Sequence, residues 1–403
     1  MSETTQFALL RERRFAPFFG VQFLGAFNDN VYKNALVLML AFHAGNLTAM
    51  SSSMLVNLCA GLFILPFFLF SATAGQLADK YEKSRIIRLV KVFEIGIMIM
   101  GAVGFITQNL TLLLLALFGM GAHSTMFGPV KYAYLPQHLR PEELVGGNGL
   151  VETGTFVAIL LGTILGGVLI AIPHNGVVWI SAVTILIAGL GYLASRAVLH
   201  SPAPSPDLAV NWNPITETWE NLKFLRGNHT VFLSILGVSW FWFYGAIFLS
   251  QFPNYSKDVL GGNEHVVTLL LAVFSIGIGI GSLLCERMSG HKVEIGLVPF
   301  GSIGLTIFAV DLYFATPALS PGAAVGAIEF LREHGNWRIL ADLFLIGAFG
   351  GFYIVPLYAL IQSRSEESHR SRIIAGNNIL NAAFMVVAAG VAIVCFELGF
   401  SIS

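Results

Sequence analysis

The sequence predicts an all-α membrane protein, and three observations lead to this fold class. Eleven apolar segments, each long enough to cross a bilayer as a helix, follow one another along the 403 residues. Charged residues make up only 11% of the chain, and its mean hydropathy is +0.75. The charged side chains gather mainly in the connections between the apolar segments, as they do in proteins that cross a membrane many times.

Each predicted span ends at a charged cluster or at a turn-forming stretch. Gly, Asn and Pro residues separate the first span from the second, the third from the fourth and the fifth from the sixth. Charged clusters separate the second from the third and the fourth from the fifth, and the later spans alternate in the same way. The predicted spans are 15–42, 52–74, 86–107, 110–134, 147–172, 176–198, 229–253, 264–285, 294–315, 338–361 and 373–398.

Lys and Arg residues are distributed unequally between the two sides of the membrane. All but four of the 22 lie at the N-terminus or in and beside the even-numbered connections. Lys91 is counted here with the flank of the second connection, at the start of the third span. By the positive-inside rule the N-terminus is therefore cytoplasmic. A net charge of -1 gives no indication of nucleic-acid binding. The three cysteines lack the spacing of disulfides or metal ligands, so we expect neither metal nor cofactor.

Two segments of the first half have weak copies in the second half. Gly75–Lys80 resembles Ser282–Arg287, and Phe127–Gln137 resembles Tyr353–Gln362, at displacements of about 200 to 230 positions. Two like-oriented halves are expected from such a repeat. The first half has six predicted spans and the second has five, so we expect that a twelfth helix is missing from this chain. A protein of eleven spans is the alternative.

The sequence therefore divides into three expected parts: an N-terminal bundle over 1–199, a central loop over 200–228 and a truncated C-terminal bundle over 229–403. Within the loop, Asn213-Pro214 has the character of a helix N-cap and first helical residue. Ile215, Trp219 and Leu222 follow at helical spacing. We expect an amphipathic helix on the inner membrane face, with partner binding as the alternative.

The connection between the second and third spans carries a family resemblance. Gly75-Gln-Leu-Ala-Asp-Lys-Tyr-Glu-Lys-Ser-Arg85 resembles the cytoplasmic signature of the major facilitator superfamily (MFS). The resemblance implies the MFS fold of two pseudo-symmetric six-helix bundles, and it implies a gating role for Asp79, Lys80 and Arg85. The acid would cap a neighbouring helix and tie the halves together in one state. A purely topological role for these charges is the alternative.

Two further motifs narrow the resemblance. Phe27-Asn-Asp-Asn-Val-Tyr-Lys-Asn34 in the first span and Phe127-Gly-Pro-Val-Lys-Tyr-Ala-Tyr-Leu-Pro-Gln137 in the fourth together resemble the bacterial lysophospholipid transporter branch. This branch moves lysophospholipids such as lyso-phosphatidylethanolamine across the inner membrane for reacylation. The expected partners are the lysophospholipid substrate, the lipid bilayer, and a fused or neighbouring acyltransferase with an acyl-carrier-protein-dependent synthetase.

The polar run of the first span is the first part of the expected substrate site. Asp29 lies about 22 Å along the helix from Arg14, near the middle of the bilayer, where a carboxylate is costly unless paired or hydrated. Lys33 is one turn away, so an internal ion pair is the structural alternative. Asn28 and Asn30 add more polar groups than such a pair needs. We therefore expect these four residues to line a substrate cavity.

Three residues from other spans complete the expected substrate site. Lys131 lies beside Pro129, which would bend the helix, although a lysine near a helix end can also extend its ammonium to the interface. Glu152 offers a counter-charge, and Asn377 offers hydrogen bonds. A lysophospholipid head group needs a cation for its phosphate and, for ethanolamine, an anion for its amine. Lys131 and Asp29 could supply these charges.

Three other functions compete with lysophospholipid transport. The first is a proton-coupled MFS carrier of a small polar solute, with Asp29 carrying the proton. The second is a membrane anchor module of a multidomain phospholipid acyltransferase. The third is an enzyme, but no His is followed by Asp at the acyltransferase spacing HxxxxD, and neither GxxxxGK[ST] nor GxSxG occurs. The sequence therefore predicts a transporter without catalytic residues.

Overall fold

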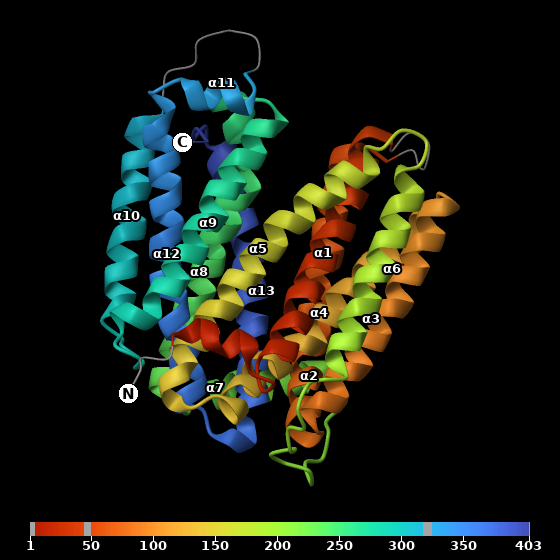
Figure 1. The fold of residues 1–403 in the computed structure, drawn as a ribbon, viewed down its shortest axis with the longest axis vertical. Helices are drawn as coiled ribbons and strands as arrows, with labels where there is room; N and C mark the ends of the chain where they lie inside the picture. The colour runs from red at the N-terminus through yellow and green to blue at the C-terminus, as the bar shows by residue number, and fades with distance from the viewer. Residues whose placement is uncertain (1–4, 44–49, 317–324, 403) are drawn as a thin grey trace. The chain divides into compact units, whose positions relative to one another are not determined.

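The computed structural model describes residues 5–43, 50–316 and 325–402, and within these ranges the regular elements are helices (Figure 1). The described residues form thirteen α-helices, with a longer loop over 196–213 between α6 and α7. Their bounds are α1 (Ala16–His43), α2 (Ser52–Lys80), α3 (Lys83–Ile106), α4 (Leu110–His138), α5 (Leu144–Ile170), α6 (Gly176–Ser195), α7 (Pro214–Leu225), α8 (His229–Asn254), α9 (Glu264–Met288), α10 (Leu297–Ala315), α11 (Ala327–Arg332), α12 (Asn336–Arg364) and α13 (Arg370–Glu397).

Ten of the described helices are long and apolar enough to cross a membrane. They correspond in order to the second through eleventh predicted spans. The first predicted span is α1, whose 28 residues also suffice to cross a bilayer. Its polar run from Asn28 to Asn34 lowers its hydropathy, so α1 is not one of the ten. The prediction of an all-α membrane protein is confirmed.

Side-chain caps explain where several helices begin. Ser51 accepts a hydrogen bond from the Met54 amide at the start of α2, and Asn109 accepts one from Leu112 at the start of α4. Asn213 accepts hydrogen bonds from the amides of Ile215 and Thr216, with Pro214 as the first residue of α7. Such caps satisfy amide groups that have no partner within the helix.

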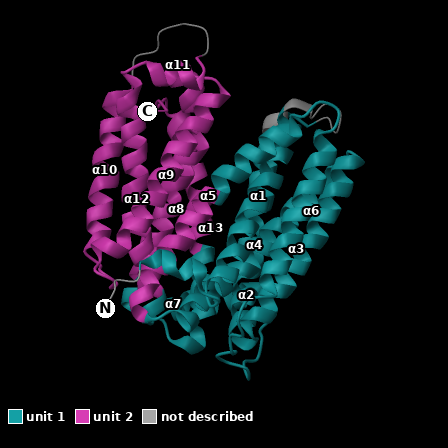
Figure 2. Cartoon of the chain, in the orientation of Figure 1, with its two compact units in different colours: residues 1–140, 158–232, 362–379 teal, residues 141–157, 233–361, 380–403 magenta. Residues whose placement is uncertain are grey.

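The chain forms two compact units (Figure 2). Unit 1 comprises residues 1–140, 158–232 and 362–379, and unit 2 comprises residues 141–157, 233–361 and 380–403. This division crosses four helices, because α5, α8, α12 and α13 each contribute to both units. It therefore differs from the division at the central loop that the sequence suggests.

Unit 1 is built around helix pairs with an apolar core. Helix α2 packs against α4, α3 packs against α4 and α6, and α1 packs against α2 and α6. The core includes Tyr32, whose hydroxyl donates a hydrogen bond of 2.9 Å to the Leu113 carbonyl. Gly101 makes room for that ring, since a Cβ there would lie 2.6 Å from Tyr32 Cε2. The buried polar residues of unit 1, described in the next subsection, are separate from this apolar core.

Unit 2 depends on close contact between α9 and α12. Gly277 and Gly281 are four residues apart on α9, and Gly347 and Gly351 have the same spacing on α12. A Cβ at any of these positions would overlap backbone atoms of the facing helix. Small residues at this spacing let two membrane helices approach closely enough for dense packing.

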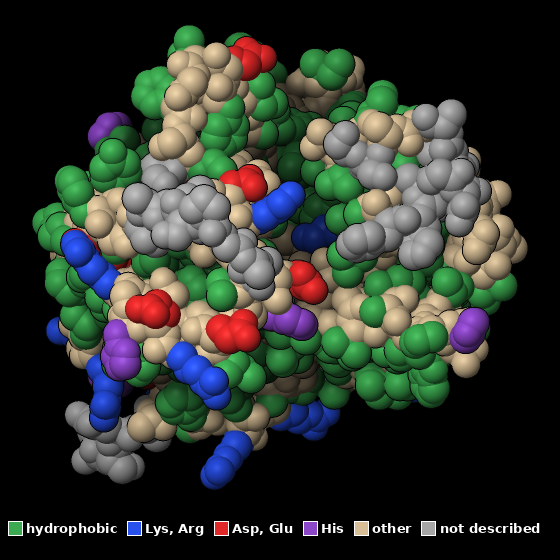
Figure 3. Space-filling model, turned by 90° about the horizontal axis from the view of Figure 1, so that it is seen from above, with side chains coloured by type: hydrophobic (Ala, Val, Ile, Leu, Met, Phe, Trp, Pro, Cys, Tyr) green, Lys and Arg blue, Asp and Glu red, His purple; other side chains and the backbone are tan. Residues whose placement is uncertain are grey.

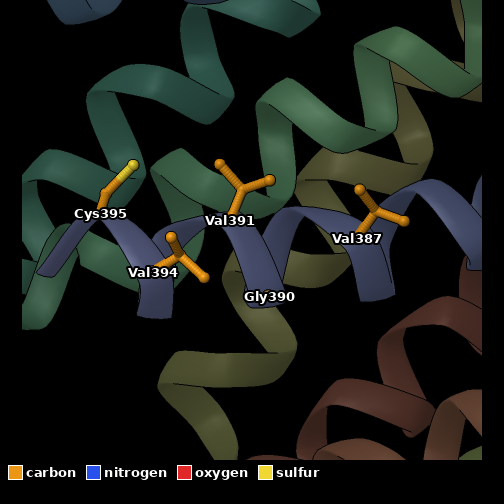
Figure 4. Close-up of a pocket in the computed structure, with 5 residues that line it drawn as sticks. All are labelled: Val387, Gly390, Val391, Val394 and Cys395. Atoms are coloured by element: carbon orange, nitrogen blue, oxygen red, sulfur yellow. The ribbon is translucent and has the colours of Figure 1, made fainter. Parts of the chain in front are cut away.

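Figure 3 looks at the molecule from above, and the end seen there carries charged side chains among hydrophobic ones. Unit 2 also has an apolar groove along α13, lined by Val387, Gly390, Val391, Val394 and Cys395 (Figure 4). The groove offers no charged group to a ligand. Charged groups are buried in both units, Asp29 and Glu94 in unit 1 and Glu152 and Asp342 in unit 2 among them.

Candidate functional site

The polar run of α1 lies within unit 1, and each of its members has a different environment. Asp29 Oδ2 accepts a hydrogen bond of 2.5 Å from Ser124 Oγ of α4, whereas Asp29 Oδ1 is buried without a hydrogen-bond donor. Asn30 Nδ2 donates to the Ala26 carbonyl of its own helix. Asn34 Nδ2 donates to the Thr163 carbonyl of α5. Asp29 therefore retains an acceptor oxygen that the protein does not use.

A second carboxylate, Glu94 of α3, is fully paired. Its Oε2 lies 2.6 Å from Lys91 Nζ, and both side chains are completely buried. Its Oε1 accepts a hydrogen bond of 2.8 Å from Asn28 Nδ2. Gly25 of α1 makes room for the lysine, since a Cβ there would lie 2.8 Å from Lys91 Nζ. An unpaired charge at such a depth would be strongly unfavourable, so Lys91 and Glu94 neutralise each other.

His123 of α4 lies between the two carboxylates. Its Nε2 is 3.2 Å from Glu94 Oε2, and its Nδ1 is 4.0 Å from Asp29 Oδ1. The imidazole is buried, and neither ring nitrogen has a partner with hydrogen-bond geometry. Its ring stacks on Phe127, over which Lys91 Nζ also lies at 5.8 Å from the centroid. We call Asn28, Asp29, Lys91, Glu94, His123 and Ser124 the polar cluster.

The other expected substrate residues are outside the polar cluster. Lys33 Nζ lies 5.3 Å from the centroid of the Phe63 ring of α2, and the ion pairs of the described residues do not include Asp29 with Lys33. Lys131 is half-buried, with Nζ 4.9 Å from the Tyr132 ring centroid. It lies seven residues beyond Ser124 on α4, or about 10 Å along the axis.

Two of the expected polar residues are buried. Asn377 of α13 belongs to unit 1, and both polar atoms of its side chain lack hydrogen-bond partners. The Nδ2 atom of its neighbour Asn378 lies against Gly128 of α4, where an added Cβ would overlap this nitrogen. Glu152 of α5 is buried within unit 2. Asn377 is therefore a second buried group in unit 1 with unused hydrogen-bonding capacity.

At one end of unit 1, Asp79 caps the start of α13. The carboxylate is fully buried and accepts hydrogen bonds from the backbone amides of Ser371 at 3.1 Å and Arg372 at 3.3 Å. Arg372 Nε donates a third, at 3.1 Å. Gly75, one turn earlier on α2, allows this approach, since a Cβ there would lie 2.7 Å from Ala375 Cβ. A carboxylate at a helix N-terminus is stabilised by the free amides and the helix dipole.

The central loop is attached to the same end of α2 and α3. Lys80 Nζ donates to the Leu208 carbonyl at 2.8 Å. Glu82 accepts from the amides of Ser84, Arg85 and Ser201. Burial works against ionisation of Glu82, but these hydrogen bonds outweigh it and lower its pKa. The Arg85 side chain is exposed, so the cation that pairs with Asp79 is Arg372.

Sequence reasoning missed Lys91, Glu94, His123 and Arg372. A signal for the first two existed, because Lys91 and Glu94 are three residues apart inside the third predicted span and such residues share a helix face. The prediction that placed Lys91 in a flank is wrong, since α3 begins at Lys83 and Lys91 is fully buried in its third turn. No spacing within a single helix marks His123 or Arg372, because their partners come from other helices.

Comparison with known proteins agrees with this architecture. The family profile described as Major Facilitator Superfamily matches residues 18–399. The chain is 29% identical over 354 residues to the lysophospholipid transporter LplT of Klebsiella pneumoniae subsp. pneumoniae, which covers 86% of this chain and 79% of the relative. It is also 29% identical over 356 residues to LplT of Escherichia coli O1:K1 / APEC, with the same coverage.

Solved structures of transporters share the fold at low sequence identity. The E. coli fucose:proton symporter FucP superposes with a TM-score of 0.69 at 15% identity, covering 96% of this chain and 92% of that one. A bacterial homologue of the iron transporter ferroportin superposes with a TM-score of 0.67 at 14% identity, covering 94% and 91%. With a family match over nearly its whole length and this helical architecture, the chain belongs to the Major Facilitator Superfamily.

Proposed function

We propose that this protein transports lysophospholipids across a bacterial inner membrane by alternating access, with its N-terminus in the cytoplasm. The curated relatives named lysophospholipid transporter align over 86% of the chain, which supports this substrate class. The distribution of Lys and Arg supports the orientation. In this proposal the chain is not itself an enzyme, and the transported lipid is reacylated by a separate or fused acyltransferase with its acyl-carrier-protein-dependent synthetase.

The observation that carries the proposal is the unequal pairing of the two buried carboxylates. Glu94 has Lys91 and Asn28 on its oxygens, whereas Asp29 has only the Ser124 hydroxyl and keeps Oδ1 unused. Because Glu94 is already neutralised, Asp29 is the carboxylate of the polar cluster that can accept a new cation. The ammonium of an ethanolamine head group is a cation that can donate a charge-assisted hydrogen bond to such a carboxylate oxygen.

The phosphate of the head group requires a cation. Lys131 fits this role, because it lies about 10 Å from Ser124 along α4 and is half-buried. Lys33, one turn from Asp29, is the other cation near the carboxylate and would stabilise the negative end of a zwitterion. Asn377 adds unused amide groups.

Asp79 is assigned to the gate. Its three hydrogen bonds join the end of α2 to the first turn of α13, so breaking them would release one helix end from the other. Lys80 holds the central loop beside this contact, and Arg85 contributes to the positive charge of the connection. A gate built from a few directional bonds can open and close without disturbing the apolar core.

A proton-coupled carrier of a small polar solute is the second candidate. The position of His123 between two carboxylates favours it, since such arrangements can pass a proton. The two functions predict different substrates in the same assay. The purified chain is reconstituted in proteoliposomes with a fluorescent lyso-phosphatidylethanolamine, and membrane-impermeant dithionite reports the fraction in each leaflet.

We expect the protein to equilibrate the labelled lipid between leaflets at least tenfold faster than empty liposomes do. The control is the same preparation with fluorescent diacyl phosphatidylethanolamine, which should remain in its leaflet. If lysolipid and diacyl lipid cross at the rate of empty liposomes while the protein is folded and inserted, the lysophospholipid proposal is wrong. The small-solute carrier would then be tested by uptake driven by a pH gradient.

A further inference from the structure

His123 lies between Asp29 and Glu94, and the Lys91–Glu94 ion pair does not explain why an imidazole is placed there. A neutral imidazole carries one N–H and can donate to one carboxylate, whereas a protonated imidazole carries two. His123 directs Nε2 toward Glu94 at 3.2 Å and Nδ1 toward Asp29 at 4.0 Å. Glu94 is already satisfied by Lys91 and Asn28. A second N–H on the imidazole would therefore act mainly on Asp29.

We propose that the protonation state of His123 selects the class of head group that the site accepts. With a neutral imidazole, Asp29 Oδ1 has no hydrogen-bond donor and can bind a cationic group such as the ammonium of ethanolamine. With a protonated imidazole, Asp29 is already paired, so the site loses its preference for a cationic head group over an uncharged one such as the glycerol of an anionic lysophospholipid. This inference rests on the proposed function, because it assumes that the head group meets Asp29.

The charged surroundings of the imidazole are few and fixed. Asp29 faces it from α1, and Lys91 and Glu94 face it from α3. Lys33 lies one turn beyond Asp29, with its ammonium at the Phe63 ring. Gly162 of α5 lies against Phe27 and Asn30, and Gly191 of α6 lies against Lys91. Helix α2, which packs against α4, presents Phe63 and Pro66 to Gly121. His123 is thus the imidazole of the polar cluster, and both of its ring nitrogens face a carboxylate.

The same geometry links head-group binding to proton release. A bound ammonium at Asp29 would lie close to the imidazole, and two cations at one carboxylate repel each other. Binding of a cationic head group therefore favours the neutral imidazole, and by linkage a higher pH favours binding of the cationic head group. A lysolipid with a glycerol head group places no cation there, so its transport should lack this dependence.

Transport of two lysolipids between pH 5.5 and 8.5 tests the inference. We expect the ratio of lyso-phosphatidylethanolamine to lyso-phosphatidylglycerol transport to rise with pH across this range, with a limiting slope of about tenfold per pH unit for one linked proton. In His123→Gln, which cannot take up a proton, the ratio should not change with pH. His265→Gln, at an exposed histidine of α9 in unit 2, is the matched control and should keep the slope.

A second measurement needs no variant. Calorimetric binding of each lysolipid to the wild-type protein in phosphate and in Tris buffer at the same pH gives the number of protons released. The inference predicts release with the ethanolamine head group and none with glycerol. A flat ratio in the wild type, a slope that persists in folded His123→Gln, or equal proton release for both lipids would each overturn it. Normal transport by Asp29→Asn would instead overturn the head-group site of the proposed function.

Discussion

Arg372 Nε donates a hydrogen bond of 3.1 Å to Asp79 Oδ2, although the two residues are 293 positions apart in the chain. The same carboxylate caps the first turn of α13 through the amides of Ser371 and Arg372. The Asp79 side chain thus pairs with the Arg372 guanidinium, caps the N-terminus of α13 and connects that helix to the end of α2. Loss of that side chain should therefore change more than a single ion pair.

Replacing Asp79 with Asn should reduce lysolipid transport at least tenfold while the protein still inserts in the membrane. The amide keeps one acceptor oxygen but loses the charge, which leaves Arg372 partly buried without its anion, at a cost of about 2–4 kcal/mol for this contact. The measurement is transport per inserted protein. Asp207→Asn, at an exposed position of the central loop, is the control. Transport near the wild-type rate would leave Asp79 as a topological charge only.

Gly75→Ala should push α2 away from α13. The new Cβ would lie 2.7 Å from Ala375 Cβ and 3.0 Å from Arg372 Cα, and overpacking of this kind costs about 1–3 kcal/mol. Gly61→Ala on the same helix meets nothing within 4 Å and should be neutral. Thermal unfolding and transport are measured for both. Equal behaviour of the two variants would show that the close approach at Gly75 is unimportant.

Removing only one member of the Lys91–Glu94 pair should destabilise the protein. Both side chains are fully buried, and breaking a buried pair typically costs about 3–5 kcal/mol because one charge remains unpaired. Glu94→Gln should therefore lower the unfolding temperature more than the double variant Lys91→Met/Glu94→Gln does. The exposed pair of Lys223 and Glu220 gives the control, Glu220→Gln, which should have little effect. A double variant less stable than Glu94→Gln would contradict this account.

Helix α7 should lie at the membrane surface. It buries Glu217, whose pKa is raised by that burial despite the nearby Arg372. It exposes the apolar side chains of Ile215 and Trp219, and Trp212, just before the helix, is exposed as well. Exposed tryptophans are typical of the lipid–water interface. In variants that keep only Trp212 or Trp219, brominated lipids should quench the fluorescence. Strong quenching by aqueous iodide with none by brominated lipid would place α7 in water.

The helices could be predicted from the sequence because the bilayer dictates their length. The predicted span 176–198 and α6 (Gly176–Ser195) agree closely, and the predicted cap at Asn213-Pro214 begins α7. The polar cluster could be predicted only in part. Asp29 is conspicuous as a carboxylate in an apolar span, but its relation to His123 depends on how α4 is rotated against α1 and α3. That rotation follows from packing among three helices, not from the spacing within any of them.

The sequence narrows the partner of Asp79 to two places, Arg85 or the start of the eleventh predicted span, without deciding between them. Arg85 belongs to the motif and was the expected gating cation, yet its side chain is exposed, whereas Arg372 lies at the first turn of the helix that Asp79 caps. Capping a helix brings the carboxylate to whichever basic residue begins that helix. The pairing therefore depends on which helix end approaches α2, and this is a property of the tertiary structure.

The most direct test of the central claim is lyso-phosphatidylethanolamine flipping by Asp29→Asn in proteoliposomes. Asn preserves the size of the side chain and can still accept the Ser124 hydrogen bond, but it offers no charge to an ammonium group. Asp258→Asn, at an exposed carboxylate, is the matched control. The account predicts that Asp29→Asn loses at least nine-tenths of the wild-type rate while Asp258→Asn retains it. Equal rates for both variants and the wild type would contradict the assignment of Asp29 as the head-group anchor.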